Sequence, residues 1–534
     1  MVKFIRLILI FSAFYLSTTS AQNKPKLVVG IVIDQMRYDY LYRYENKYGK
    51  GGFKKLMQEG FHCKNNHYNY VPTYTGPGHA SIYTGTVPAI HGIIANDWFD
   101  RKKDAFIYCA EDKSVKSVGT DNNAGLMSPK NMLTSSICDQ LRIHYNFFNK
   151  TIGIAIKDRG AILPAGHSAN AAYWYDALTG KWISSSYYMD SLPIWVQGFN
   201  QLSLPTKYAN TLWQTLLPIE QYKESTTDNN VWEDHPKIDT APVFPHKFKG
   251  DIGLIRASPF GNTLTKEFAF ATIKGEKLGK DSIPDFLAIS FSSPDYVGHL
   301  YGPNSIESED TYLRLDKDIE EILQFLDREV GKNQYLVFLT ADHGVADIPG
   351  YSNHIKLPGK VLNIKAIDTA VKQILIKEFG NENWVSAIDN DQIFLNRNMF
   401  KSKNIELKKA VDIILPILLD QPGIQFAVNL QNMDKTTMPT LFKEKIINGC
   451  NQKRSGDIQY ITEPGWITHG MRGTTHGSSW NYDTHVPLIF YGTQIKKGET
   501  TERTSITDIA PTIANQLNIL APNGCIGNII KMSK

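Results

Sequence analysis

The sequence predicts an α/β protein with a mostly parallel central sheet, helices on both faces of the sheet and an inserted cap-like region. Three observations favour this fold class. The strand candidates are mostly continuous Val, Ile, Leu and Phe runs, as expected for strands that are covered on both faces. Helical patterns fall between these runs, and such alternation is typical of a parallel sheet. A length of 534 residues, with 42% of them apolar, allows one large core with insertions.

Five apolar segments are expected to form strands of this sheet. They cover residues 26–34, 151–156, 286–292, 335–340 and 486–491. The clearest helix is predicted for residues 309–330, where apolar side chains such as Tyr312, Leu315 and Ile319 recur at helical spacing. Residues 132–145 and 407–419 are the next helix candidates.

Two stretches differ from the rest of the chain. Residues 184–280 are rich in Trp, Tyr and Pro and weakly periodic, and residues 357–465 combine helices with mixed segments. We interpret both as insertions that form a smaller cap-like region over the site. The core would then consist of residues 22–183, 281–356 and 466–534.

The N-terminus has the pattern of a secretory signal peptide. Lys3 and Arg6 precede an apolar run over residues 7–16, and small residues follow it, with cleavage expected after Ala21. A membrane anchor is the alternative, although the run is short for a transmembrane span. We therefore expect a periplasmic or secreted protein.

Charge and cysteine content narrow the class of protein further. The net charge is +4 with the charges interspersed, and no basic run predicts a surface for duplex nucleic acid. The cysteines are Cys63, Cys109, Cys138, Cys450 and Cys525. An exported protein can pair cysteines, but five leave one over, and the sequence does not give the connectivity.

Six side chains of metal-binding types follow or adjoin the strand candidates. They are Asp34, Asp295, His299, Asp342, His343 and His476. Three aspartates and three histidines suffice for two zinc ions with three protein ligands each and an open position. Two zinc ions about 4 Å apart are a common device for phosphoryl transfer. Ligands of parallel sheets gather beyond the carboxyl ends of the strands, which is where the three aspartates are expected.

Each of these candidates also has a plainer interpretation. Asp34 ends an apolar strand, where a metal would offset the cost of burying a carboxylate, but it is equally compatible with a turn or a helix cap. Asp295 and His299 are four residues apart and would share one helical face, as a solvated pair also would. Asp342 and His343 precede a glycine that allows a sharp turn, so the two adjacent side chains are able to converge.

Three histidines near the C-terminus compete for the last ligand position. We favour His476, because it lies in a Gly-containing HGSS segment shortly before the last core strand. His469 and His485 are the alternatives. His79 is expected to be structural.

Thr75 is the candidate nucleophile. It lies two residues before Pro77, which is favourable in the first turn of a helix, so Thr75 would stand at a helix N-terminus suited to phosphate. A hydroxyl coordinated to zinc loses its proton more easily and becomes a nucleophile. An ordinary helix cap is the alternative.

Three further side chains are candidates for binding a phosphoryl group. Lys157 and Arg159 follow the apolar run TIGIAI, and in an extended segment residues two apart point the same way. Both charges would then reach one phosphoryl group, unless they form a solvated loop pair. Asn96 would donate an amide N–H to the same oxygens, or else serve as a turn residue.

At this point the motifs resemble the alkaline phosphatase superfamily, and within it the secreted, phosphate-irrepressible alkaline phosphatases of the PafA type. The resemblance runs through PTYTGPGHASIYTG, HGIIANDW, the KDRG segment, SSPDYVGH, TADHG and THGSSWNYDTHVP. It implies a zinc-dependent phosphomonoesterase of broad substrate range that acts on small phosphorylated metabolites through a phospho-threonine intermediate.

The resemblance also assigns roles to the candidate residues. By this analogy Asp34, Asp342 and His343 hold the zinc that activates Thr75. Asp295, His299 and His476 hold the zinc that stabilises the leaving oxygen. Asn96, Lys157 and Arg159 bind the non-bridging phosphoryl oxygens.

Other functions remain open from sequence. Nucleotide pyrophosphatases and phosphodiesterases share the threonine and a similar asparagine but have an apolar pocket in place of the KDR segment, so Lys157 and Arg159 favour monoesters. A non-catalytic phosphate- or metal-binding protein is a second alternative. A sulfatase is disfavoured because the Thr75 segment lacks the expected arginine, and a glycolytic phosphomutase because of the signal peptide. Stable membrane insertion is not expected, and a monomer is compatible with the sequence.

Overall fold

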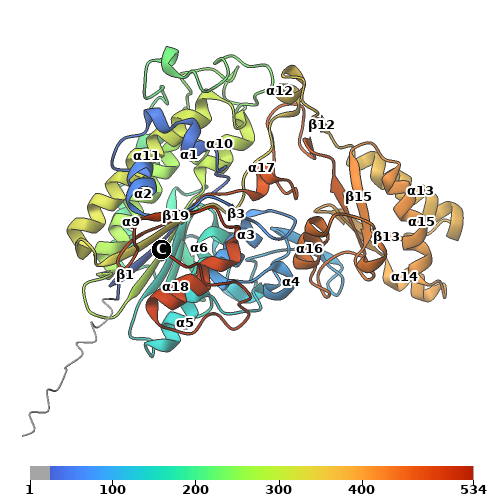
Figure 1. The fold of residues 1–534 in the computed structure, drawn as a ribbon, viewed down its shortest axis with the longest axis horizontal. Coiled ribbons are helices and arrows are strands. Elements are labelled where there is room, and N and C mark those ends of the chain that lie inside the picture. Colours follow the sequence, from blue (N-terminus) through green and yellow to red (C-terminus); the bar gives the residue numbers. More distant parts are fainter. Residues whose placement is uncertain (1–23, 533–534) are drawn as a thin grey trace, which may run out of the picture.

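The computed structural model describes residues 24–532, and a ten-stranded sheet forms its centre (Figure 1). Across the sheet the strands are β19 (Gly498–Thr500), β2 (Phe61–Cys63), β18 (Leu488–Gly492), β11 (Tyr335–Thr340), β1 (Leu27–Ile33), β10 (Asp285–Phe291), β7 (Thr151–Ala155), β8 (Ala171–Asp176), β9 (Lys181–Ser185) and β6 (Ser117–Val118). The five strands from β11 to β8 are parallel. Toward the edges the β18–β11, β2–β18, β9–β8 and β6–β9 pairs are antiparallel, and β19 pairs in parallel with β2. The predicted fold class is confirmed.

The central strand β1 determines where the site forms. All seven of its residues are buried, because helices cover the sheet on both faces. It pairs in parallel with β10 on one side and β11 on the other, with Leu27 opposite Asp285 and Tyr335. The chain therefore leaves β1, β10 and β11 at the same edge of the sheet, where ligands of such folds bind.

Two groups of helices enclose the sheet. On one side α9 (Pro259–Glu276), α10 (Ser293–Tyr301) and α11 (Ile306–Leu326) pack on one another, and on the other side lie α3 (Thr75–Thr84), α5 (Ile137–His144), α6 (Asp158–Ala165) and α18 (Ile509–Leu517) (Figure 1). The helix predicted over residues 309–330 is α11. The helix predicted over residues 132–145 begins only at Ile137, because Ser136 and Asp139 form a capping box there.

The expected cap over residues 184–280 divides differently in the structure. Its last part forms α9, which packs on β7, β10 and α11. Phe268 of this helix stacks on Trp182 of β9, with ring centroids 4.0 Å apart. That part of the segment is therefore a layer of the main sheet and not a cap.

Residues 360–467 form a second, smaller unit, which we call the small lobe (Figure 1, orange). Its antiparallel sheet has the order β13 (Val385–Asp389), β14 (Gln392–Leu395), β16 (Ile458–Thr462) and β15 (Ile424–Asn429). Helices α13 (Ile364–Phe379) and α15 (Leu407–Leu419) bury a separate hydrophobic core against this sheet. Helix α15 has the bounds that the sequence predicts.

Polar contacts fix the small lobe against the hairpin of β4 (Asp97–Asp100) and β5 (Ala105–Tyr108). Arg101 in this hairpin donates to the Ser455 carbonyl at 2.6 Å and to the buried Asp457 carboxylate at 3.1 Å. The Asn390 amide donates to the Asp97 carbonyl at 2.8 Å. The tip of the β13–β14 hairpin is thereby held beside β4.

The expectations about export, membrane insertion and disulfides have different outcomes. The expected signal peptide, residues 1–21, lies outside the described residues. Within residues 24–532, no helix has the length and apolar character needed to cross a membrane. The five cysteines are all free thiols in this structure.

Helix α3 approaches the end of β11 closely at Gly78. A Cβ atom on Gly78 would lie 2.5 Å from the Asp342 carbonyl oxygen, so only glycine fits without a shift of the helix or the strand end. The contact places the N-terminus of α3 next to the residues that follow β11.

We expect the substitution Gly78→Ala to destabilise the protein by about 1–3 kcal/mol, because the added methyl group overpacks this contact. Gly198→Ala is the matched control, since it also lies in a helix, α7 (Ile194–Gln201), and its added Cβ meets nothing within 4 Å. It is expected to stabilise the protein by about 0.5–1 kcal/mol. Unfolding midpoints in urea measure both, and equal midpoint shifts would contradict the close packing of α3.

Candidate active site

The predicted site residues converge at the sheet edge where β1, β10 and β11 end. Asp34 directly follows β1, and Asp342 and His343 follow β11. Asp295 and His299 lie in the first and last turns of α10, which follows β10. His476 comes from the loop before α17 (Asn481–Thr484). The three aspartates and His343 are at most 3% exposed, so their charges lie in a medium of low polarity.

The metal-type ligands form two compact groups that share one carboxylate. The ligand atoms of Asp295, His299 and His476 lie within 4.8 Å of one another, and so do those of Asp34, Asp295 and His343. Asp342 lies outside these compact groups, although its Oδ2 is 3.6 Å from His343 Nε2. The family resemblance groups Asp34 and His343 with Asp342. In the structure Asp295 takes the place of Asp342 in that compact group, and it belongs to the other group as well.

Backbone carbonyls orient the three histidines. The hydrogen bonds run from His299 Nδ1 to the Thr474 carbonyl at 2.7 Å, from His343 Nδ1 to the Gly344 carbonyl at 2.9 Å, and from His476 Nδ1 to the Thr73 carbonyl at 2.7 Å. In the neutral form of each ring this bond leaves Nε2 unprotonated, as in metal-binding histidines. Burial lowers the pKa of His343 and His476, which favours the neutral form that coordinates a metal.

The carboxylates have buried oxygens without hydrogen bonds. Oδ1 of Asp34 and Oδ2 of Asp342 are buried and accept none, whereas Oδ2 of Asp34 pairs with the Lys157 ammonium. Burial raises the pKa of Asp34, and the neighbouring Asp342 carboxylate raises it further. A divalent cation would satisfy such oxygens, and the mixed Asp and His donors suit zinc. The residues present therefore fit a metal centre.

Gln35 holds two of these carboxylates in place. Its backbone N–H donates to Asp342 Oδ1 at 3.1 Å, and its side-chain amide donates to Asp295 Oδ1 at 2.7 Å. Gly298 makes room for it, because a Cβ there would lie 1.8 Å from Gln35 Oε1. The sequence analysis missed Gln35, whose only signal is its place directly after Asp34.

Thr75 is the first residue of α3 and is 1% exposed. Its Oγ1 lies 3.4 Å from Lys157 Nζ and 3.5 Å from His343 Nε2. Asn96 Oδ1 accepts a hydrogen bond of 2.8 Å from the Gly76 N–H, which turns the NH₂ group of Asn96 away from the helix. The structure thus brings the hydroxyl, the amide and the metal-type ligands together.

Lys157 reaches the same centre by a different route from the one expected. The segment is not extended through Arg159, because β7 ends at Ala155 and α6 begins at Asp158. Lys157 Nζ lies 2.7 Å from Asp34 Oδ2 and 2.5 Å from Asp295 Oδ2. Burial lowers the pKa of Lys157, but the two carboxylates raise it overall, so the ammonium stays charged.

Arg159 lies in the first turn of α6, and two neighbours orient it. Its Nη1 donates to the Tyr108 hydroxyl at 3.1 Å, and that hydroxyl donates to the Asp158 carboxylate. Its Nε is buried without a partner, which leaves an N–H donor for an anion. Tyr108 comes from β5, and no local sequence pattern connects it to Arg159.

The competing histidines lie apart from the two groups. The ring of His485 stacks on Tyr38 with centroids 4.1 Å apart, and its Nε2 bonds to the Lys64 carbonyl. The ring of His469 lies 6.2 Å from that of His299, between centroids. His79 bonds to Ser290 Oγ and to the Thr75 carbonyl, which is the structural role expected of it.

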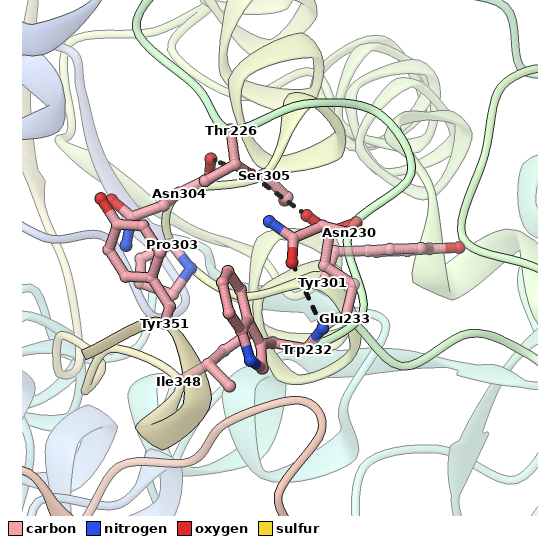
Figure 2. A pocket seen from close by; sticks show the side chains of 10 residues that line it. All are labelled: Thr226, Asn230, Trp232, Glu233, Tyr301, Pro303, Asn304, Ser305, Ile348 and Tyr351. Atoms are coloured by element: carbon pink, nitrogen blue, oxygen red, sulfur yellow. Dashed lines mark hydrogen bonds between the residues drawn. The ribbon is translucent and has the colours of Figure 1, made fainter. Parts of the chain in front are cut away.

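A small cavity behind α10 is walled by Trp232, Glu233 and Tyr301, among others (Figure 2). The Trp232 carbonyl accepts from the Gly473 N–H at 3.0 Å, and so supports the loop that leads to His476. Burial raises the pKa of Glu233 to about 10, so this carboxyl group is neutral. The cavity wall therefore supports the loop before His476, and Glu233 adds no charge there.

Comparison with known proteins agrees with this geometry. The family model described as type I phosphodiesterase / nucleotide pyrophosphatase matches residues 28–487. The alkaline phosphatase PhoV of Synechococcus elongatus is 49% identical, over 95% of this chain and 92% of PhoV. The alkaline phosphatase PafA of Elizabethkingia meningoseptica is 44% identical, over 96% of this chain and 95% of PafA.

Solved structures give the same result. A crystal structure of wild-type PafA matches with a TM-score of 0.92 and covers 95% of this chain and 98% of its own. A PafA variant with substitutions at one threonine, one asparagine, one lysine and one arginine matches equally well, at 43% identity. The resemblance seen in the motifs is confirmed, and the chain belongs to the type I phosphodiesterase / nucleotide pyrophosphatase family, together with the alkaline phosphatases PhoV and PafA.

Proposed function

We propose that this protein is an alkaline phosphatase that hydrolyses phosphate monoesters of many alcohols, with Thr75 as the nucleophile. The observation that carries the proposal is the position of Thr75 Oγ1, which lies at a helix N-terminus within 3.5 Å of both Lys157 Nζ and His343 Nε2. The names of the relatives PhoV and PafA support it.

Two zinc ions are the proposed cofactors. Asp34, Asp342 and His343 would hold one ion beside Thr75, and Asp295, His299 and His476 would hold the other. When bound, such ions make a coordinated hydroxyl more acidic and stabilise the charge on a leaving oxygen. The buried Oδ1 of Asp34 and Oδ2 of Asp342, which accept no hydrogen bond, support this assignment.

In the first step Thr75 Oγ attacks phosphorus, the bond from phosphorus to the substrate alcohol breaks, and the alcohol departs. In the second step water breaks the bond between phosphorus and Oγ and releases inorganic phosphate. The N-terminus of α3 faces the transferred group with its positive dipole end, which stabilises the non-bridging oxygens in both steps.

Lys157, Arg159 and Asn96 are the proposed ligands of those oxygens. A monoester carries two negative charges at phosphorus, and the two cations match them. The four residue types changed in the PafA variant occur in the same chain order as Thr75, Asn96, Lys157 and Arg159, which supports a shared set.

A phosphodiesterase is the second candidate, because the matching family model carries that description. A diester has one charge at phosphorus and a second organic substituent there. The buried cation Lys157 and the half-buried cation Arg159 favour the doubly charged monoester. We further propose export through the N-terminal signal, on the sequence pattern alone.

Removing the nucleophile is expected to abolish turnover. Thr75→Ala should lower kcat by at least about 10³-fold, as loss of a nucleophile does in covalent catalysis, and Thr75→Ser should retain part of the activity. Acid-quenched wild-type protein should carry phosphate on Thr75, detected by mass spectrometry. Near-normal turnover by Thr75→Ala would contradict the covalent route.

Arg159→Ala is expected to lower kcat/KM for 4-nitrophenyl phosphate by about 10- to 100-fold, because a charge-assisted contact is lost. Hydrolysis of bis(4-nitrophenyl) phosphate should fall less, so the ratio of monoester to diester activity falls. The matched control is Arg328→Ala at an exposed position. If the diester is the better substrate of the unaltered protein, the phosphodiesterase candidate replaces the monoesterase.

Metal removal should abolish activity, and zinc should restore it. Elemental analysis of the active protein is expected to give two zinc ions per chain, and chelation to a residual content near zero. Added zinc should also raise the unfolding temperature of the chelated protein, since an ion that binds only the folded state stabilises it. Full activity with one ion per chain would overturn the two-metal assignment.

A further inference from the structure

A cleft opens beside the proposed phosphoryl site. It has a volume of about 510 Å³, is open to solvent, and is lined by Tyr74, Asn96, Asp97, Phe106, Asp389 and Asn390. The lining consists of two carboxylates, two amides and two aromatic rings. The first four of these residues lie outside the small lobe and form one side of the cleft, and the small lobe provides Asp389 and Asn390.

The cleft begins at the reacting group. Tyr74 directly precedes Thr75, and Asn96 bonds to the backbone of Gly76. The three aspartates and His343 are buried and His299 and His476 are half-buried, whereas the cleft is open. The alcohol part of a bound monoester, which has to extend from phosphorus toward solvent, therefore has room in this cleft.

The small lobe holds its side of the cleft rigidly. Strands β13 and β14 are joined by a two-residue turn in which Asn390 and Asp391 have φ of +54° and +57°, as in the tight turns of hairpins. The Asn390 amide donates both to the Asp97 carbonyl and to Asp389 Oδ2, each at 2.8 Å. The carboxylate of Asp389 is thus positioned across from β4.

The cleft is negatively charged at neutral and alkaline pH. Burial raises the pKa of Asp389 to about 6, so its carboxylate is ionised above that pH. Asp97 is exposed, although its partial burial raises the pKa of its carboxyl group; Arg159 opposes that rise and is itself engaged by Tyr108. The nearby Arg101 pairs with Asp457, so its charge is already balanced outside the cleft.

The aromatic rings add a second attraction for cations. Phe106 is 52% exposed although it is a large apolar side chain, and Phe99 supports it edge-on with ring centroids 5.8 Å apart. Tyr74 forms another part of the wall. Aromatic faces next to carboxylates are the chemistry that recognises ammonium groups.

We propose that this cleft selects monoesters whose alcohol carries a positive charge, as a primary or quaternary ammonium group, with Asp97, Asp389 and Phe106 as the specificity-determining residues. The inference rests on the proposed phosphomonoesterase function and names its preferred substrate class. Substrates with an anionic alcohol part are disfavoured, because like charges repel in the same cleft.

The test compares phosphocholine with its uncharged isostere, 3,3-dimethylbutyl phosphate. The two alcohols differ in leaving-group acidity, so the readout is the change in the ratio of their kcat/KM values between variants. Asp389→Asn and Asp97→Asn should each lower the ratio of phosphocholine to isostere by about 2- to 5-fold, the range for partly exposed ion pairs, and the double variant by more. Phe106→Leu, which keeps an apolar side chain, should lower it through loss of the ring.

The matched control is Asp412→Asn, which removes the same charge from an exposed position on α15 of the small lobe. It should leave the ratio unchanged. If both monoesters are hydrolysed and the ratio stays constant in Asp389→Asn, Asp97→Asn and the double variant, the cleft does not select cations and the phosphomonoesterase function stands. If the zinc-loaded wild-type protein hydrolyses neither ester, the function and the inference fail together.

Discussion

The concentration of negative charge at one edge of the central sheet is the constraint on which the rest of the structure depends. Asp34, Asp295 and Asp342 are at most 3% exposed and meet where β1, β10 and β11 end. Buried carboxylates at this distance repel one another and need positive partners. Lys157 lies between two of them, Gln35 donates to two, and backbone carbonyls orient the imidazoles of His299, His343 and His476 beside them.

The same constraint explains the features that surround the site. Helix α3 approaches β11 without a side chain at Gly78, and this close contact brings a helix N-terminus and the Thr75 hydroxyl to the edge where the charges lie. The His476 imidazole bonds to the carbonyl of Thr73, two residues before the proposed nucleophile. The nucleophile and the metal-type ligands are thus parts of one hydrogen-bonded arrangement.

The sequence predicts the parts of this arrangement that are local. The strands are continuous apolar runs, and Asp34, Asp342 and His343 lie within three residues of a strand end, so pattern and position agree. The prediction of an extended segment through Arg159 was wrong, because α6 begins immediately after Lys157. An apolar strand pattern does not reveal this turn into a helix. The helix at 259–276 was interpreted as part of a cap because the whole segment 184–280 is rich in Trp, Tyr and Pro and weakly periodic.

Contacts between distant segments could not be predicted in the same way. Tyr108 orients Arg159 from a hairpin some fifty positions earlier, and Asp389 reaches the cleft from the small lobe. Neither residue has a sequence signal, because each is placed by the docking of one unit on another. By contrast, the family and its phosphatase activity could be predicted from the resemblance, because the residues that carry it lie in short contiguous motifs.

The small lobe offers the cleft little more than the tip of one hairpin, while its own hydrophobic core lies elsewhere, between its sheet and the helices α13 and α15. The residues that keep the lobe folded and the residues that line the cleft are therefore different residues. Substitutions at the hairpin tip can then be selected at small cost to folding, and they leave the carboxylates at the sheet edge unchanged. An enzyme built in this way can keep its reaction constant while the residues at the hairpin tip, and with them one wall of the cleft, change.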